Sequence, residues 1–162
     1  MDVLVPFAVA EPKSRLAPVL TPDERREFAR AMLADVLDAI VLAGGTPHIL
    51  ATEPFDPAVD IPGSLDPPVV VDDRPLTDAV NTALERHGHT ASGSTIATDT
   101  TGDSAFPCED GVAVVMADLA LATPDALTRL FEPDRDGNPS EESPADVTIA
   151  PGRGGGTNAL VV

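Results

Sequence analysis

The chain has 162 residues, which fits one domain with a core large enough to need no disulfide or metal staple. Acidic residues outnumber basic ones by 27 to 10, and the net charge of -17 argues against nucleic acid partners and against a polybasic membrane-surface protein. A hydrophobic fraction of 43% argues against disorder, and the single cysteine argues against a disulfide scaffold and agrees with a reducing cytoplasm.

The basic residues are unevenly divided, since there are nine arginines and one lysine, Lys13. Many carboxylates with little lysine are typical of proteins from extreme halophiles, in which concentrated salt screens the mutual repulsion. Chance could also leave one lysine in a chain of this length. The composition therefore predicts a halophilic protein and marks Lys13 as a candidate for a role that arginine cannot fill.

The first elements are a buried strand at residues 3–5 and a long helix. The helix is predicted to begin at Thr21, because Thr21, Pro22 and Glu24 match a capping box with proline in the first turn. It is predicted to stop at the glycines 44–45. Its buried stripe is expected to consist of residues four apart: Phe28, Met32, Val36 and Ile40.

Apolar runs and helical patterns alternate along the rest of the chain. Further strands are predicted at 48–51, 69–71, 112–116 and 147–150, and further helices at 77–87 and from 123 to 131. The second helix would face the core with Leu76, Val80 and Leu84. Residues 88–110 turn to glycine, serine, threonine and alanine, which predicts a flexible surface insertion, and residues 133–144 read as a loop.

This order of elements predicts an α/β fold, because apolar strands separated by helices indicate a mostly parallel sheet with helices on both faces. The first residues show no basic segment and no long apolar run, so we expect neither a signal peptide nor a membrane span. The sequence ends in what reads as a strand with no covering helix. We therefore expect that the domain lacks its C-terminal part, or that a partner subunit in a homodimer covers the sheet.

Ligands of parallel sheets bind outside the carboxyl ends of the strands, so the segments after residues 5, 116 and 150 are candidate sites. Lys13 and Arg15 follow the first strand and suit a polyphosphate, although an ordinary solvated loop would look the same. Asp118 directly follows the most apolar strand. Such an aspartate typically holds Mg²⁺, but it could equally be a turn residue.

A glycine-rich segment, residues 152–156, is followed by Thr157 and Asn158. Its backbone N–H groups could approach an anion, while a simple hairpin turn is the alternative. Weaker signals are a metal site at His87 and His89, a nucleophile at Cys108, and the pair Asp72 and Asp73, for which a solvated turn is favoured.

The three segments together resemble the 2-phospho-L-lactate guanylyltransferases of deazaflavin coenzyme biosynthesis. The similarity spans nearly the whole chain and rests on these motifs: Val5-Pro6-Phe7, Pro12-Lys13-Ser14-Arg15-Leu16, Glu27-Phe28-Ala29-Arg30-Ala31-Met32-Leu33, Val115-Met116-Ala117-Asp118-Leu119, and Ile149-Ala150-Pro151-Gly152-Arg153-Gly154-Gly155-Gly156-Thr157-Asn158-Ala159-Leu160. The last motif is the most specific, whereas Ala117-Asp118-Leu119 alone is shared with many nucleotidyltransferases.

The resemblance implies a cytoplasmic nucleotidyltransferase with the Rossmann-like fold of the nucleotide-diphospho-sugar transferases. It would join GTP to 2-phospho-L-lactate, or to phosphoenolpyruvate as in related enzymes, and release pyrophosphate in coenzyme F-420 biosynthesis. By matching position, Asp118 would hold Mg²⁺, Lys13 and Arg15 would face the triphosphate, and Thr157, with Asn158, would contact the phosphate of the acceptor.

Two departures keep alternatives open. The family runs further and carries a second metal-binding aspartate there, so the chain could be a truncated, inactive nucleotide-binding module. The loop Asp73-Arg74-Pro75-Leu76, where relatives bind the base, lacks an expected glycine. Another nucleotidyltransferase of the same fold, acting on a molybdenum cofactor or a sugar phosphate, is disfavoured because residues 7–12 contain no glycine.

Overall fold

The computed structural model describes residues 1–61, 63, 65–90, 111–119, 122–132, 147–152 and 157–162. The described residues form one six-stranded sheet in the order β3-β2-β1-β4-β6-β5. Its strands are β1 (Asp2–Phe7), β2 (Thr46–Ala51), β3 (Val69–Val71), β4 (Val112–Val115), β5 (Thr148–Pro151) and β6 (Thr157–Val161). Strands β1 to β4 run parallel, and β6 is antiparallel to both of its neighbours. The predicted mostly parallel α/β sheet is therefore confirmed.

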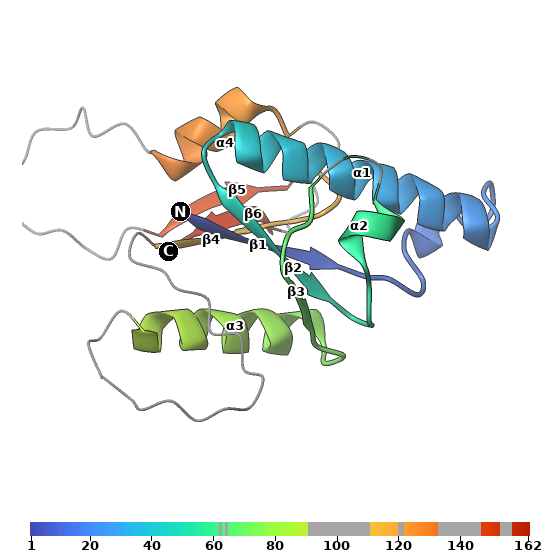
Figure 1. Ribbon diagram of the computed structural model, residues 1–162, viewed down its shortest axis with the longest axis horizontal. Helices are drawn as coiled ribbons and strands as arrows, with labels where there is room; N and C mark the ends of the chain where they lie inside the picture. Colours follow the sequence, from blue (N-terminus) through green and yellow to red (C-terminus); the bar gives the residue numbers. More distant parts are fainter. Residues whose placement is uncertain (62, 64, 91–110, 120–121, 133–146, 153–156) are drawn as a thin grey trace, which may run out of the picture.

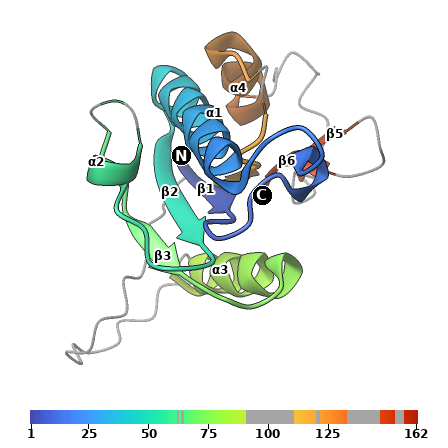
Figure 2. The same cartoon turned by 90° about the vertical axis from the view of Figure 1, so that its right-hand side faces the viewer.

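Helices cover both faces of this sheet (Figures 1 and 2). Helices α1 (Pro22–Leu42) and α4 (Pro124–Phe131) lie on one face, and α3 (Leu76–Thr90) lies on the other. A short helix α2 (Pro57–Asp60) and a 3₁₀ turn η1 (Ser14–Leu16) complete the described elements. No helix in these ranges is both long and apolar enough to cross a bilayer.

Strand β1 is central because both of its faces are covered. Val3, Val5 and Phe7 belong to the core under α1 and α4, whereas Leu4 packs with the core residues of α3. Side chains of a strand alternate between its faces, so a strand buried on both sides must be apolar at every position. This explains the uninterrupted run Val3-Leu4-Val5 and fixes β1 in the middle of the domain.

The buried stripe predicted for α1 is wrong in its first half, since Phe28 is 44% exposed. The buried residues of this helix are Ala29, Leu33, Val36, Leu37, Ala39 and Ile40. A strict four-residue repeat drifts by about 40° per step in a helix of 3.6 residues per turn, so Phe28 turns away from the face that contains Ile40. The first turns of α1 also extend beyond the strands, where no sheet lies beneath them (Figure 1).

Helix α3 departs from the prediction in two ways. Its buried residues are Ala79 and Ala83, with Val80 and Leu84 only partly buried and Leu76 half exposed, so the packed face is shifted by one residue. The helix also continues through Thr90, which means that residues 88–90 do not belong to the predicted insertion. Residues 91–110, including Cys108, and residues 133–146 lie outside the described residues.

The predicted capping box at the start of α1 is confirmed. The Thr21 hydroxyl accepts a hydrogen bond from the Glu24 backbone N–H at 3.3 Å, and the Glu24 carboxylate accepts one from the Thr21 N–H at 2.8 Å. Thr21→Ala should therefore destabilise the fold by about 1 kcal/mol, measured as the free energy of unfolding in urea. Thr21→Ser keeps the hydroxyl and should match the wild type; equal losses in both variants would contradict this role.

Candidate functional site

The loop after β1 places a lysine above the carboxyl end of the sheet. The Val9 N–H donates to the Thr52 hydroxyl at 3.1 Å, which ties this loop to the residue that follows β2. Lys13 then adopts a left-handed backbone, with φ 53° and ψ 43°, and its carbonyl accepts from the Leu16 N–H at 2.8 Å to start η1. Left-handed backbone is uncommon for residues other than glycine, so the loop holds Lys13 in a defined position.

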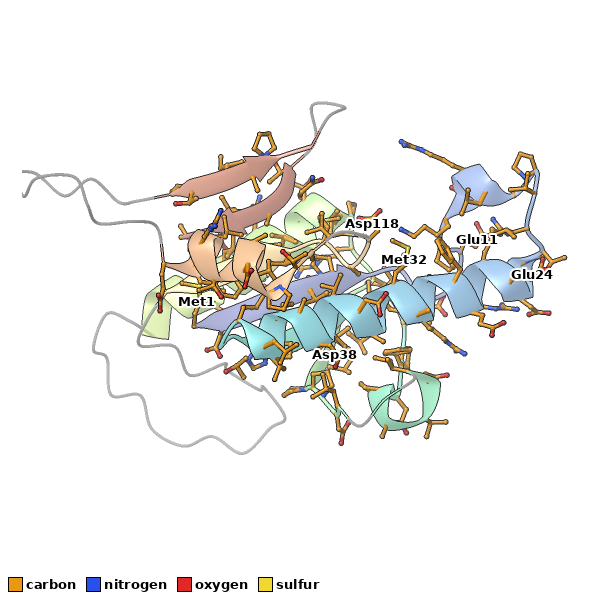
Figure 3. The ribbon with its side chains drawn as sticks, turned by 90° about the horizontal axis from the view of Figure 1, so that it is seen from above. Met1, Glu11, Glu24, Met32, Asp38 and Asp118 are labelled. Atoms are coloured by element: carbon orange, nitrogen blue, oxygen red, sulfur yellow. The ribbon has the colours of Figure 1, made fainter. Side chains whose placement is uncertain are left out.

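An aspartate follows the neighbouring strand β4 at the same edge of the sheet. The chain turns after β4, where the Leu119 N–H donates to the Met116 carbonyl at 3.3 Å. The side chain of Asp118 is 57% exposed, so its carboxylate is available to a ligand. Figure 3 shows Asp118 at the end of the sheet that faces the loop carrying the labelled Glu11.

These two candidate residues, 105 positions apart in sequence, contact each other. The Lys13 Nζ donates to the Asp118 Oδ2 at 3.0 Å, and the lysine side chain is only 20% exposed. Both residues line a cavity of about 530 Å³, together with Arg15 and the ends of β1 and β4. The structure therefore brings together the three residues predicted for phosphate and metal binding.

Some lining residues were not predicted from the sequence: Pro6, Phe7, Ala8, Pro12, Ser14, Leu16, Ala29, Met116 and Ala117. Phe7 also packs against Phe55, with ring centroids 5.2 Å apart. The alternation along β1 could have placed Phe7 on the α1 side, because it is two and four residues from Val5 and Val3. No sequence signal places Ala29 at the cavity, since that depends on the angle at which α1 crosses the sheet.

Of the two residues predicted to contact the acceptor substrate, Thr157 and Asn158, only Asn158 lines a cavity together with Asp118. The Met116 N–H donates to the Asn158 carbonyl at 3.0 Å, so the start of β6 lies beside the end of β4. Asn158 and Asp118 line a second cavity of about 540 Å³ with Leu119, Ala150 and α4. Thr157 is exposed at the start of β6 and lines neither of these cavities.

The glycine-rich segment joins two antiparallel neighbours, β5 and β6, which is the arrangement of a hairpin. Residues 153–156 lie outside the described residues, so an anion-binding role for them stays a prediction. The weak metal signal at His87 and His89 falls at the end of α3. No group of three or more histidine, cysteine or acidic side chains in the described ranges could hold a metal ion.

The loop after β3 uses Asp72 to hold Arg74. The Arg74 Nε donates to the Asp72 Oδ1 at 2.8 Å, and this hydrogen bond lowers the pKa of the Asp72 carboxyl to about 2. The same guanidinium donates through Nη1 to the Thr82 hydroxyl of α3 at 3.1 Å. Asp72 therefore holds the guanidinium that contacts α3, and because its side chain is only 13% exposed it is not the solvated turn residue that the sequence favoured. Neither Asp72 nor Asp73 lines the cavity at Lys13.

Asp118 is the carboxylate that would hold Mg²⁺ at this site. Mg²⁺ in phosphate-transferring sites commonly takes one or two carboxylates and completes its shell with phosphate oxygens and water. One exposed carboxylate beside two basic side chains fits a cation that arrives on a polyphosphate. It does not fit a cation cage made by protein ligands alone.

The fold defines a Rossmann-like class of α/β protein with a candidate site at the carboxyl ends of its parallel strands. A crystal structure from Desulfovibrio desulfuricans G20, assigned as a nucleotide-diphospho-sugar transferase, matches with a TM-score of 0.65 over 99% of this chain and 62% of that chain. The two sequences are 16% identical, so this similarity supports the fold alone. The Rossmann-like fold of this type expected from the sequence is therefore confirmed.

Sequence comparison identifies the family. The model described as "Guanylyl transferase CofC like" matches residues 1–162, and the chain belongs to this family. The 2-phospho-L-lactate guanylyltransferase of Haloterrigena turkmenica is 52% identical over 100% of this chain and 62% of its own length. That of Halorubrum lacusprofundi is 51% identical over 99% of this chain and 60% of its own length. The chain thus spans about three fifths of these relatives.

Proposed function

We propose that the chain transfers the guanylyl group of GTP to 2-phospho-L-lactate, with phosphoenolpyruvate as the alternative acceptor. The observation that carries this proposal is the Lys13–Asp118 pair in a cavity of about 530 Å³ at the carboxyl ends of β1 and β4. Two basic side chains, Lys13 and Arg15, beside a single carboxylate suit a metal-bound triphosphate. Membership in the family supports GTP and a phosphorylated carboxylic acid as the substrates.

The reaction forms one P–O bond and breaks another. A phosphate oxygen of the acceptor attacks the α-phosphorus of GTP, and the bond from that phosphorus to the oxygen shared with the β-phosphate breaks, releasing pyrophosphate. The nucleophile is already an anion, so no strong general base is needed. The main barrier is the approach of two anions, which positioning and positive charge must lower.

Each candidate site residue has its own part in this scheme. Lys13 and Arg15 hold the β- and γ-phosphates and take up the negative charge that moves to the leaving pyrophosphate. Asp118 holds Mg²⁺, which when bound neutralises phosphate charge. Asn158 lines the adjoining cavity and is proposed, with Thr157, to orient the phosphate of the acceptor.

Pyrophosphate release tests the proposed function. The assay should show release with GTP and 2-phospho-L-lactate together, and none with either substrate alone. Release of pyrophosphate with ATP at the same rate would overturn guanine specificity. Binding of GTP with no release for any acceptor would instead support the alternative of an inactive nucleotide-binding module.

We further propose that the protein works in the salt-rich cytoplasm of a halophile, without a nucleic acid partner. The relatives named above carry halophile genus names, and the charge of -17 is consistent with that environment. The Debye length falls from about 10 Å at 0.1 M salt to about 3 Å at 1 M, so molar salt should relieve repulsion among the acidic residues.

The melting temperature should therefore rise strongly between low and molar KCl, as followed by circular dichroism. Sucrose serves as the control, because it stabilises proteins by exclusion from their surface and does not screen charge. A melting temperature that is the same in low and molar KCl, or that sucrose raises as much as KCl does, would contradict the proposed salt adaptation.

A further inference from the structure

The ammonium of Lys13 contacts the carboxylate of Asp118, the residue proposed to hold the cation. The Lys13 Nζ lies 3.0 Å from the Asp118 Oδ2. A divalent cation held by the same carboxylate would be a close neighbour of this ammonium. Like charges at such a distance repel one another, and the repulsion is larger near a protein than in bulk water.

The loop fixes the backbone of Lys13 close to Asp118. Lys13 has the left-handed φ of 53°, its carbonyl accepts from Leu16, and its side chain is 20% exposed. Arg15 lies in the same loop and lines the same cavity, but it forms no ion pair within the described part of the chain. Lys13 is thus the basic residue of this loop that neutralises Asp118.

We infer that Lys13 and a divalent cation compete for Asp118, and that a polyphosphate is needed to draw Lys13 away. This inference rests on the proposed role of Asp118 in holding the cation. In the free protein the carboxylate is paired with the ammonium. When a metal–triphosphate complex binds, Lys13 transfers to the phosphates and the cation takes its place on Asp118, so every charge keeps a partner in both states.

The consequence is a coupled mode of binding. A free divalent cation binds weakly because it must displace Lys13 with no phosphate to receive the ammonium. A triphosphate without a cation binds weakly too, because it brings its own charge next to a carboxylate that loses its partner. The metal and the nucleotide therefore bind together more tightly than either binds alone.

Binding of Mn²⁺, measured by the electron paramagnetic resonance of the free ion in the absence of nucleotide, tests this competition. Lys13→Met should raise the affinity for Mn²⁺ at least about tenfold over the wild type, because both the competitor and its positive charge are removed. Arg15→Met is the matched control, since it removes the same charge from the same loop without freeing Asp118, and it should change the affinity much less. The gain should vanish in the double variant with Asp118→Asn.

Equal Mn²⁺ affinities in the wild type and Lys13→Met, or equal gains in Lys13→Met and Arg15→Met, would overturn the inference. A gain that persists in the double variant would also overturn it, because the cation would then bind elsewhere. None of these measurements involves guanine or an acceptor. Failure of guanylyl transfer with the predicted Mn²⁺ results would therefore overturn the proposed function and leave the competition intact.

The single lysine of the sequence provides a second measurement that needs no change at Lys13. In protein labelled with ¹³C-lysine, the Cε methylene group of Lys13 gives one NMR signal. Mg²⁺ alone at moderate concentration should leave this signal unchanged, and Mg²⁺ with inorganic tripolyphosphate should shift it. Asp118→Asn should shift the signal without any ligand, and an unchanged signal in that variant would show that the ion pair does not form in solution.

Discussion

Asp118→Asn is expected to abolish guanylyl transfer and to leave the fold intact. The amide keeps the shape of the carboxylate but loses the charge that would hold Mg²⁺ and pair with Lys13. Charge stabilisation by a metal ion contributes several kcal/mol to such a transition state, so turnover should fall by about a thousandfold or more. The side chain is 57% exposed, so the melting temperature should change little.

Asp38→Asn is the matched control for this variant. It makes the same chemical change at an exposed residue of α1 that lines neither cavity and lies away from Asp118 in Figure 3. Its pyrophosphate release should equal that of the wild type under the same salt and Mg²⁺ concentrations. If Asp118→Asn retained full activity, another group would have to hold the metal ion.

Lys13→Ala should have the second largest effect on turnover. If Lys13 stabilises the leaving pyrophosphate, its contact strengthens as charge develops, so kcat should fall more than the affinity for GTP. By analogy with the loss of one oxyanion donor, the cost should be about 2–4 kcal/mol in the transition state. Lys13→Arg should also lose activity, because a planar guanidinium does not replace a compact ammonium at this position.

The melting temperature distinguishes a role of Lys13 in turnover from a role in holding the fold together. Lys13 has a φ of 53°, a conformation that glycine adopts without strain, so Lys13→Gly should leave the melting temperature nearly unchanged while turnover falls. Arg129→Ala is a suitable control, because it removes a basic side chain from the exposed surface of α4 and should not affect the rate. A wild-type rate of turnover in Lys13→Ala would show that Lys13 does not take part in the reaction.

The parts of the fold that the sequence predicts well are those determined by local signals. The capping box at Thr21 depends on residues three apart, and the double burial of β1 follows from its unbroken apolar run. The pairing of β6 with β4 could not be predicted, because the paired residues are more than forty positions apart in sequence. The stripe of α1 failed at Phe28 because a four-residue repeat drifts around the helix, so the neighbouring Ala29, which is 3% exposed, faces the core in its place.

The sequence was sufficient to predict at which edge of the sheet the site lies. Parallel strands bring their carboxyl ends together, so the loop of Lys13 and the turn of Asp118 were expected at one side of the sheet. The ion pair itself was not expected, because it joins side chains of residues that are 105 positions apart in sequence. That contact changes the interpretation of both residues, since each is the partner of the other before any ligand binds.

The most direct test of the proposed function is the identity of the product, followed by ³¹P NMR in molar KCl with Mg²⁺, GTP and 2-phospho-L-lactate. The proposed reaction joins the α-phosphate of GTP to the phosphate of the acceptor. It therefore predicts a new pair of mutually coupled diphosphate signals that grows together with pyrophosphate. Unchanged GTP signals, or their conversion to GDP and inorganic phosphate without that new pair, would contradict it.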